Sequence, residues 1–302
     1  MTQRLDWERD GREWPHRERS LFIDAADLRW HIQHWQADRS NAPTVLLLHG
    51  TGASTHSWRA LAPLLAKDFS VLAIDLPGHA FTSMPSEGPS SPQLSMQGMA
   101  QAVAGLLRTL NMSPALMVGH SAGAAIALRM CLDELAAPRL VVGLNAALLP
   151  LRGLAGQLFS PVAKIMAATP LVPRLFAWRA HEPAVLNRLL ESTGSRLDAE
   201  GVALYGRLVG NAGHAAGALG MMANWDLQAL AHDLARLRVP LDLVVGSRDY
   251  TVPPAQAERV LARLPASIHG TLTRLQGLGH LAHEEKPEQV AKLIVERFLL
   301  RQ

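Results

Sequence analysis

A serine set among small residues is the strongest chemical signal in this 302-residue sequence. Residues 119–123 read Gly-His-Ser-Ala-Gly, a G-x-S-x-G pattern centred on Ser121. Where a strand turns sharply into a helix, this pattern exposes the serine hydroxyl, and the helix N-terminus favours developing negative charge. A short apolar run over 115–118 precedes the serine, and an Ala-rich run follows it over 122–128. This context predicts a nucleophilic serine on a strand–turn–helix.

A serine becomes nucleophilic when a base takes its proton and a carboxylate orients that base. Asp249 and His280 each follow an apolar run that predicts a strand, over 241–246 and 271–275. Reactive groups of open α/β sheets collect at the carboxyl ends of the strands. We therefore predict a catalytic triad of Ser121, Asp249 and His280, in the chain order Ser, Asp, His.

Other residues compete for these roles. His283 is the rival base, but it stands beside two glutamates where the chain turns towards the last helix. Asp75 lies in an Asp-Leu-Pro-Gly-His segment and resembles a structural turn residue. A structural role in a turn is also the alternative interpretation of Asp249. Asn145 ends another predicted strand and cannot act as the acid, which favours Asp249.

Two backbone N–H groups are expected to form an oxyanion hole. One belongs to Ala122, directly after the nucleophile, and the other to Thr51 in the segment His-Gly-Thr-Gly, with Gly52 as the alternative. Losing one such donor typically costs about 10²–10³ in rate. His49 is expected to brace this loop rather than to react.

Apolar runs alternate with helical segments along most of the chain, which predicts an α/β fold with a mostly parallel sheet covered on both faces. A polar turn at 25–27 separates two alternating segments and predicts a hairpin. Strands are expected over 21–24, 28–35, 44–48, 70–74, 115–118, 140–145, 241–246 and 271–275. Helices are expected at about 58–66, 96–110, 254–264 and 287–300.

Residues 146–225 contain helical segments separated by prolines and glycines, without a convincing buried strand. This block interrupts the strand pattern and is predicted to be a helical lid. The core would then comprise residues 1–145 and 226–302, with a charged, tryptophan-containing N-terminal arm over 1–19.

Apolar residues of the lid, together with the neighbour of the serine, are the candidates for substrate binding. Ordinary packing is the alternative explanation for the lid residues. For His120, which precedes the serine, the alternative is a role as scaffold of the turn. The candidates are His120, Leu149, Phe159, Met222 and Trp225.

The composition excludes several function classes. A formal charge of +3 without a long basic run argues against nucleic-acid binding, and a single cysteine, Cys131, excludes an internal disulfide. Residues 1–20 lack the apolar region of a secretory signal, and charges interrupt the apolar segment 146–178, so no membrane span is expected. We expect a cytoplasmic protein, although the apolar lid and the basic pI permit peripheral membrane contact.

No metal site or cofactor is expected. The pairs His31/His34 and His280/His283 lack a third ligand at a suitable offset. No G-x-G-x-x-G or P-loop pattern follows a predicted strand, which argues against a nucleotide cofactor.

Five segments of this sequence resemble motifs of the α/β-hydrolase superfamily. They read HGTGASTHSW, DLPGHAFT, GHSAGAAIALRM, GSRDYTVPP and GLGHLAHEEKP. The resemblance covers nearly the whole chain and implies the α/β-hydrolase fold with an inserted helical lid. Ala80 departs from the glycine that often follows the histidine of the second motif. The serine nucleophile argues against the dehalogenase and epoxide hydrolase branches, which use aspartate at that turn.

A narrower resemblance lies in the arm and the lid. The segments WERDGREWP, LNAALLPLRGLAGQLFSP and GALGMMANWDL are similar to those of the magnesium-chelatase accessory proteins of bacteriochlorophyll biosynthesis, the BchO type. This resemblance implies a phototrophic bacterium and a role near magnesium insertion into protoporphyrin IX. It implies a pathway more securely than a reaction.

Three functions fit these observations. The first is a serine hydrolase acting on an ester or similar acyl bond of a small apolar substrate, with tetrapyrroles among the candidates. The second is a non-catalytic protein that binds a porphyrin or contacts magnesium chelatase. The third is hydrolysis of a carbon–carbon bond. A complete triad favours chemistry, because a carrier does not need a proton relay.

Overall fold

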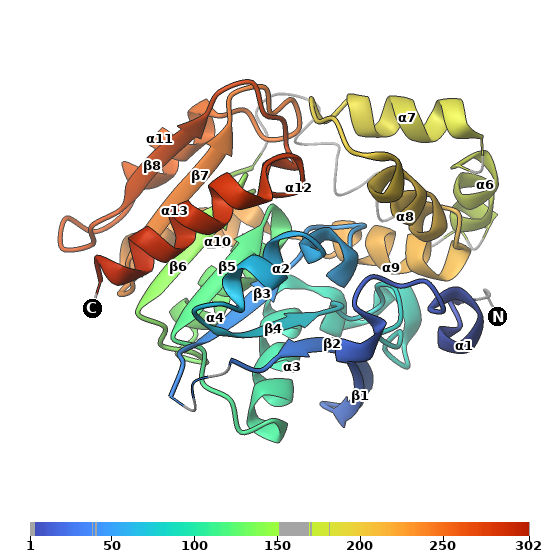
Figure 1. Cartoon of the computed structure of the whole chain (residues 1–302), viewed down its shortest axis with the longest axis horizontal. Helices are drawn as coiled ribbons and strands as arrows, with labels where there is room; N and C mark the ends of the chain where they lie inside the picture. Colours follow the sequence, from blue (N-terminus) through green and yellow to red (C-terminus); the bar gives the residue numbers. More distant parts are fainter. Residues whose placement is uncertain are drawn as a thin grey trace.

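The centre of the molecule is a single sheet of eight strands, formed within the described part of the chain (Figure 1). The computed structural model describes residues 4–37, 39, 41–150, 169, 171–180 and 182–301, without the side chains of residues 171, 176 and 180. The order is β1-β2-β4-β3-β5-β6-β7-β8. The strands are β1 Ser20–Ala25, β2 Leu28–Trp35, β3 Thr44–Leu48, β4 Ser70–Ile74, β5 Leu116–His120, β6 Leu140–Leu144, β7 Leu241–Gly246 and β8 Thr271–Leu275.

Pairing within the sheet is parallel except at one edge. β1 and β2 form an antiparallel hairpin, β2 pairs antiparallel with β4, and the remaining pairs, from β4–β3 to β7–β8, are parallel. The hairpin turns at Ala26 and Asp27, both of which have positive φ, 48° and 59°. The predicted fold class and the predicted hairpin are therefore confirmed.

Both faces of the sheet are covered, which explains why the central strands lack polar alternation. In β3, Leu46 and Leu48 pack in the core on one face, and Val45 and Leu47 pack in the core on the other. The first core contains α3 Met96–Thr109, α4 Ala122–Leu132, α10 Leu227–Asp233 and α11 Ala255–Leu261. The second contains α2 Leu61–Leu65 and α13 Pro287–Leu299.

The prediction of a helix at about 58–66 is wrong in its bounds. A 3₁₀ turn, η2 Thr55–Trp58, starts earlier, because the Ser54 hydroxyl accepts from the backbone N–H of His56 and caps it. The α-helix α2 then covers only Leu61–Leu65. Several short elements were not predicted. These are α1 Trp7–Asp10, α10, α12 Ala282–Glu285, η1 Arg17–Arg19, η3 Gly88–Ser90, η4 Pro92–Leu94 and η5 Leu234–Arg236. All but α10 contain only three or four residues, which is too few for a periodic pattern.

Between β6 and α10 the described residues form a separate group of helices, at the right of Figure 1. They are α6 Leu171–Ala180, α7 Pro183–Glu191, α8 Ala199–Val209 and α9 Ala212–Ala223. The N-terminal arm packs beside this group: Trp14 is buried in a cluster with Phe81 and with Leu204 and Leu208 of α8. The arm is thus held by its aromatic side chains.

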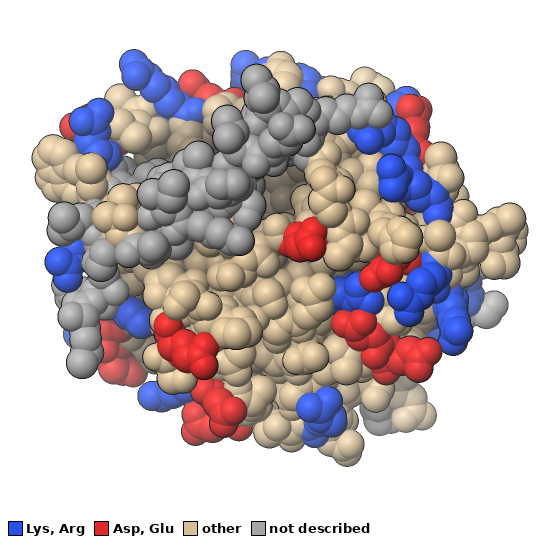
Figure 2. All heavy atoms as spheres, turned by 180° about the vertical axis from the view of Figure 1, so that it is seen from behind, with Lys and Arg blue, Asp and Glu red and all other residues tan. Residues whose placement is uncertain are grey.

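Charges of both signs share the surface. On the face in Figure 2, Lys and Arg lie among Asp and Glu around a broad, mostly uncharged area. Within the described residues, no helix has the length and apolar character needed to cross a bilayer.

Candidate active site

Ser121 occupies the turn between β5 and α4, as the sequence predicts. Its backbone has φ 51° and ψ −115°, outside the regions that a serine normally adopts. Its amide N–H donates to the carbonyl of Leu144 at 3.0 Å, and its own carbonyl accepts from Ala147 at 3.1 Å. Such strain persists only when surrounding contacts hold it, and it occurs often at functional sites.

The small residues of the motif allow strand and helix to approach. A Cβ at Gly119 would overlap the backbone of Ala124, and a Cβ at Gly123 would overlap the carbonyl oxygen of Leu48 in β3. The first turn of α4 therefore lies directly against the central strands. This contact explains why glycines stand two residues to either side of the serine.

Replacing Gly123 with alanine is expected to lower the free energy of unfolding by about 1–3 kcal/mol, the usual cost of overpacking. The matched control is Gly206→Ala in α8, whose new Cβ would stand 3.1 Å from the end of the flexible Leu186 side chain. That change is expected to be neutral or slightly stabilising, because alanine favours a helix interior. Urea denaturation followed by circular dichroism measures both; equal effects would contradict the proposed contact.

Asp249 and His280 meet after β7 and β8. His280 Nδ1 donates to Asp249 Oδ2 at 2.8 Å, and the Asn145 side-chain amide donates to the same oxygen at 2.8 Å. The other carboxylate oxygen, Oδ1, accepts from the backbone N–H groups of Thr251 and Val252. These donors fix the carboxylate, and the bond to Nδ1 leaves His280 Nε2 as the ring nitrogen that can act as a base.

The residue next to the serine connects the two halves of the site. His120 Nε2 donates to the carbonyl oxygen of His280 at 3.0 Å, and the two rings lie 4.8 Å apart. His120 is 2% exposed. These contacts favour the scaffold role over substrate binding for His120, and they bring the loop that carries His280 against the turn that carries Ser121.

The rival base is enclosed. His283 lies in α12 against Trp58 and His120, with ring centroids 4.8 and 4.5 Å away. Neither of its nitrogens has a hydrogen-bond partner among the described residues, and burial lowers its pKa to about 3. A ring that is neutral, buried and held away from solvent is poorly suited to accept a proton from substrate.

The connection between α7 and α8 supports the loop that carries His280. The sequence analysis did not predict this role. The carbonyl of Thr193 accepts from the N–H of His280 at 3.1 Å, and the Ser195 hydroxyl accepts from Leu281 N–H at 2.8 Å. A Cβ at Gly194 would overlap the carbonyl of Arg248, beside Asp249. The Thr-Gly-Ser segment is typical of an ordinary turn, so its local sequence carries no signal for this contact.

The predicted oxyanion loop lies beside the serine. A Cβ at Gly50 would stand 3.1 Å from Ser121 Cβ and 2.8 Å from His120 Nδ1. The carbonyl of Gly50 accepts from His49 Nδ1 at 2.8 Å and from Ala53 N–H at 3.1 Å. Because a trans peptide directs its C=O and N–H to opposite sides, these two donors orient the N–H of Thr51 away from themselves.

His49 braces this loop. Its Nε2 accepts from the N–H of Leu76 at 2.9 Å while its Nδ1–H is directed at Gly50, so the ring is neutral and has one defined tautomer. Burial lowers its pKa, with a smaller opposing contribution from Asp75. The second predicted donor, Ala122, is the first residue of α4, where backbone N–H groups have no partner within the helix.

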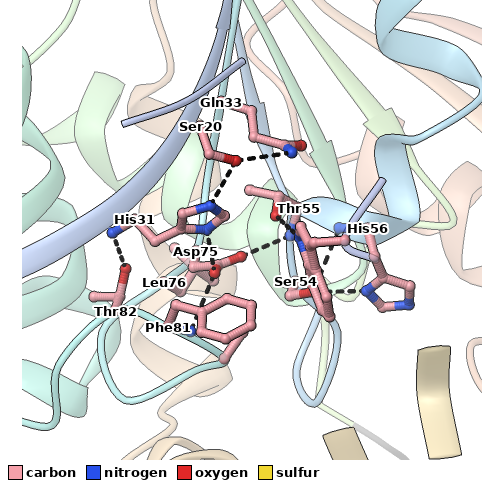
Figure 3. Close-up of polar contacts among 12 residues, drawn as sticks. Ser20, His31, Gln33, Ser54, Thr55, His56, Asp75, Leu76, Phe81 and Thr82 are labelled. Atoms are coloured by element: carbon pink, nitrogen blue, oxygen red, sulfur yellow. Dashed lines mark hydrogen bonds and ion pairs between the residues drawn. The ribbon is translucent and has the colours of Figure 1, made fainter. Parts of the chain in front are cut away.

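Asp75 is a structural residue whose carboxylate accepts hydrogen bonds from two separate loops (Figure 3). Its Oδ1 accepts from Thr55 N–H at 2.7 Å, and its Oδ2 accepts from Phe81 N–H at 3.3 Å and from His31 Nδ1 at 2.7 Å. The carboxylate therefore joins the chain after the oxyanion loop to the turn after β4. This agrees with the interpretation of Asp75 as a turn residue.

His31 also contacts Ser20, so that Ser20, His31 and Asp75 form a hydrogen-bonded Ser-His-Asp chain (Figure 3). His31 is fully buried against the rings of Trp7 and Phe81. A substrate cannot reach an imidazole enclosed in this way, so we assign this chain a structural role. Among the described residues, no group of three or more His, Cys, Asp or Glu is arranged to hold a metal ion.

The apolar candidates for substrate binding differ in position. Leu149 is buried in the first core, and Trp225 is partly buried against that core. Met222 is partly buried in α9, and Phe159 lies outside the described residues. A substrate role for these residues stays a prediction, with the burial of Leu149 favouring core packing.

Comparisons with known proteins agree on the fold. The profile of the alpha/beta hydrolase family matches residues 45–293. The magnesium-chelatase 30 kDa subunit of Rhodobacter capsulatus is 36% identical over 285 residues, which is 94% of this chain and 95% of that protein.

Solved structures show the same architecture. An alpha/beta hydrolase fold protein from Burkholderia ambifaria superimposes with a TM-score of 0.73 at 22% identity, covering 98% of this chain and 100% of that one. A thermophilic esterase from Thermogutta terrifontis superimposes with a TM-score of 0.70 at 22% identity, covering 93% of this chain and 98% of that one.

Proposed function

The chain belongs to the α/β-hydrolase family, and on this basis we propose that it is a serine hydrolase that cleaves an ester or similar acyl bond. Ser121 Oγ attacks the acyl carbon, and His280 Nε2 takes the hydroxyl proton and returns it to the leaving group. Asp249 holds His280 in the tautomer that this transfer needs. A water molecule then hydrolyses the acyl-enzyme by the same relay.

The oxyanion of each tetrahedral intermediate is held by the N–H groups of Ala122 and Thr51. Ala122 contributes the N-terminus of α4, where the helix dipole also favours negative charge. Thr51 contributes an N–H directed by the bonds to the Gly50 carbonyl. Such preorganised donors are often the largest single contribution to catalysis.

The observation that carries this proposal is the fixed Asp249–His280 pair joined to the strained Ser121 turn. The His120 bond to the His280 carbonyl makes that connection. A protein without catalytic activity has no need for a strained serine together with an imidazole that a carboxylate orients. Strain of this kind costs about 1–3 kcal/mol.

We further propose that helices α6–α9 form the predicted lid and that the substrate is small and apolar, with tetrapyrroles among the candidates. The relationship to the R. capsulatus magnesium-chelatase subunit supports a function associated with magnesium chelatase. The part of the site that faces the substrate would then come from the helices between β6 and β7.

A fluorophosphonate probe tests the nucleophile before any substrate is known. The folded protein is expected to be labelled stoichiometrically, with the modified peptide mapping to Ser121, and heat-denatured protein is expected to remain unlabelled. A His280→Ala variant should react at least about 10³-fold more slowly, because the base is lost. Equal labelling of the folded and the denatured protein would reject the proposed activity.

The second candidate is a non-catalytic, porphyrin-binding accessory protein of magnesium chelatase. The R. capsulatus relative is named as a magnesium-chelatase subunit, which favours an association with magnesium chelatase. Titration with protoporphyrin IX, followed by tryptophan fluorescence, is expected to give saturable quenching if the porphyrin binds near Trp225. Saturable quenching without any labelling of Ser121 would favour the accessory role over the hydrolase.

A further inference from the structure

Helix α9 reaches the oxyanion loop through one buried side chain. His214 Nδ1 accepts from the backbone N–H of Ala80 at 2.9 Å, and its other ring nitrogen, Nε2, lies 3.0 Å from the carbonyl oxygen of Gly52. The side chain is 1% exposed. His214 therefore bridges the turn after β4 and the loop that supplies the predicted oxyanion donor.

The hydrogen bonds define the state of the ring. An acceptor at Nδ1 requires that the proton is on Nε2, which then donates to the Gly52 carbonyl. Burial lowers the pKa of His214 to about 4, so the ring is neutral near pH 7 and this tautomer persists. Both nitrogens have a backbone partner.

Two planar peptide groups connect His214 to the N–H of Thr51. The Gly52 carbonyl belongs to the same peptide as the N–H of Ala53, which donates to the carbonyl of Gly50 at 3.1 Å. The Gly50 carbonyl in turn shares its peptide with the N–H of Thr51. Because each peptide is rigid, fixing one end fixes the direction of the other.

We propose that His214 is a positioning residue that holds the oxyanion loop in its active conformation and makes this conformation dependent on the docking of α9. The inference rests on the proposed hydrolase function. It assigns to a lid helix a role in transition-state stabilisation, in addition to any contact with substrate.

Other contacts place α9 firmly on the same loops. A Cβ at Gly217 would overlap the carbonyl oxygen of Gly78, so α9 touches the turn after β4 directly. The Thr51 hydroxyl lies 3.4 Å from the sulfur of Met221. The side chain of Asn211 caps the helix by accepting from the N–H of His214. Movement of α9 would break the bond to Gly52 along with these contacts.

Two substitutions separate the two bonds of His214. In His214→Gln the amide nitrogen can take the place of Nε2 and keep the bond to Gly52, whereas the acceptor for Ala80 is lost. In His214→Asn the amide oxygen can take the place of Nδ1 and keep the bond to Ala80, whereas the donor to Gly52 is lost. The kcat and KM for a p-nitrophenyl ester, the rate of fluorophosphonate labelling and the melting temperature are measured for both.

His214→Asn is expected to lower kcat and the labelling rate about 10²-fold, the loss typical of one oxyanion donor, with KM changed less than about 3-fold. His214→Gln is expected to keep kcat within about 3-fold of the original protein, although it loses the other bond. Equal losses in the two variants, or a larger loss in the glutamine variant, would overturn the assignment to Gly52.

Amide hydrogen exchange of Ala53, followed by NMR, tests the loop independently of activity. Exchange is expected to be at least about 10-fold faster in His214→Asn than in His214→Gln, because only the asparagine variant frees this peptide. If no variant hydrolyses esters or reacts with the probe, the hydrolase proposal fails, and the exchange rates still decide the loop assignment. Equal exchange in both variants would refute it.

Discussion

Replacing Ser121 with alanine is expected to lower kcat for ester hydrolysis about 10⁶-fold, to the level of the uncatalysed reaction plus residual binding effects. The change removes the group proposed to form a bond to the acyl carbon, and no other side chain takes its place. Turnover of p-nitrophenyl esters of several chain lengths measures the effect. The melting temperature should change little, because alanine keeps the backbone hydrogen bonds of the turn.

The same experiment includes a test of the relay. His280→Ala alone and the double variant with Ser121→Ala should be as inactive as Ser121→Ala, because residues that act as one unit have non-additive effects. The matched control is His232→Gln, which changes an exposed histidine of α10 that has no part in the proposed relay and should leave kcat unchanged. Residual activity that falls further in the double variant would show that the two residues do not act together.

The protein is expected to lose stability steeply as the pH falls below 6.5. Burial lowers the pKa of several fully buried histidines below the ordinary value of 6.5, to about 4 for His214 and about 3 for His283. Burial also lowers the pKa of His49, His56, His79 and His120. The unfolded chain binds protons at these groups near pH 6.5, whereas the folded protein does not. The free energy of unfolding therefore decreases as the pH falls from 6.5 towards the folded pKa values.

The expected loss of unfolding free energy is large relative to the total unfolding free energy of a typical domain. At pH 5, each histidine that stays neutral in the folded state costs about 2 kcal/mol, so His214 and His283 together cost about 4 kcal/mol. Typical domains have only about 5–15 kcal/mol in total. Glu284 acts in the opposite direction, because burial raises its pKa to about 7 and the folded state takes up its proton first. The stability that Glu284 gains on protonation offsets the loss caused by about one of these histidines.

Urea denaturation at pH 7.5 and pH 5 measures this loss. His283→Leu removes one buried titrating group that has no hydrogen-bond partner among the described residues. Its loss of stability between the two pH values is expected to be about 2 kcal/mol smaller than that of the original protein. The exposed control His232→Gln should leave the loss unchanged. Parallel pH profiles for His283→Leu and the original protein would contradict this explanation.

The fold class and the places of the predicted triad along the chain could be inferred from local sequence patterns. Apolar runs such as Thr44–Leu48 and Leu241–Gly246 indicated strands buried on both faces, and the structure confirms them. Ser121, Asp249 and His280 could be selected because each follows a strand, and parallel strands present their carboxyl ends at one edge. Patterns of neighbouring residues are sufficient for conclusions of this kind, because the period and the burial of a strand are local properties.

The choice of partners among the polar groups became clear only from the three-dimensional arrangement. His31 and His34 stand out as a pair in the sequence, whereas in the structure His31 pairs with Asp75 at the end of another strand. The contacts of Thr193 with His280 and of His214 with Gly52 also join distant segments, the latter 162 residues apart. The tautomers of His49 and His214, and hence the direction of the Thr51 N–H, follow from such long-range bonds. A sequence specifies which groups can donate and accept, whereas burial and the packing of distant segments determine which of them meet.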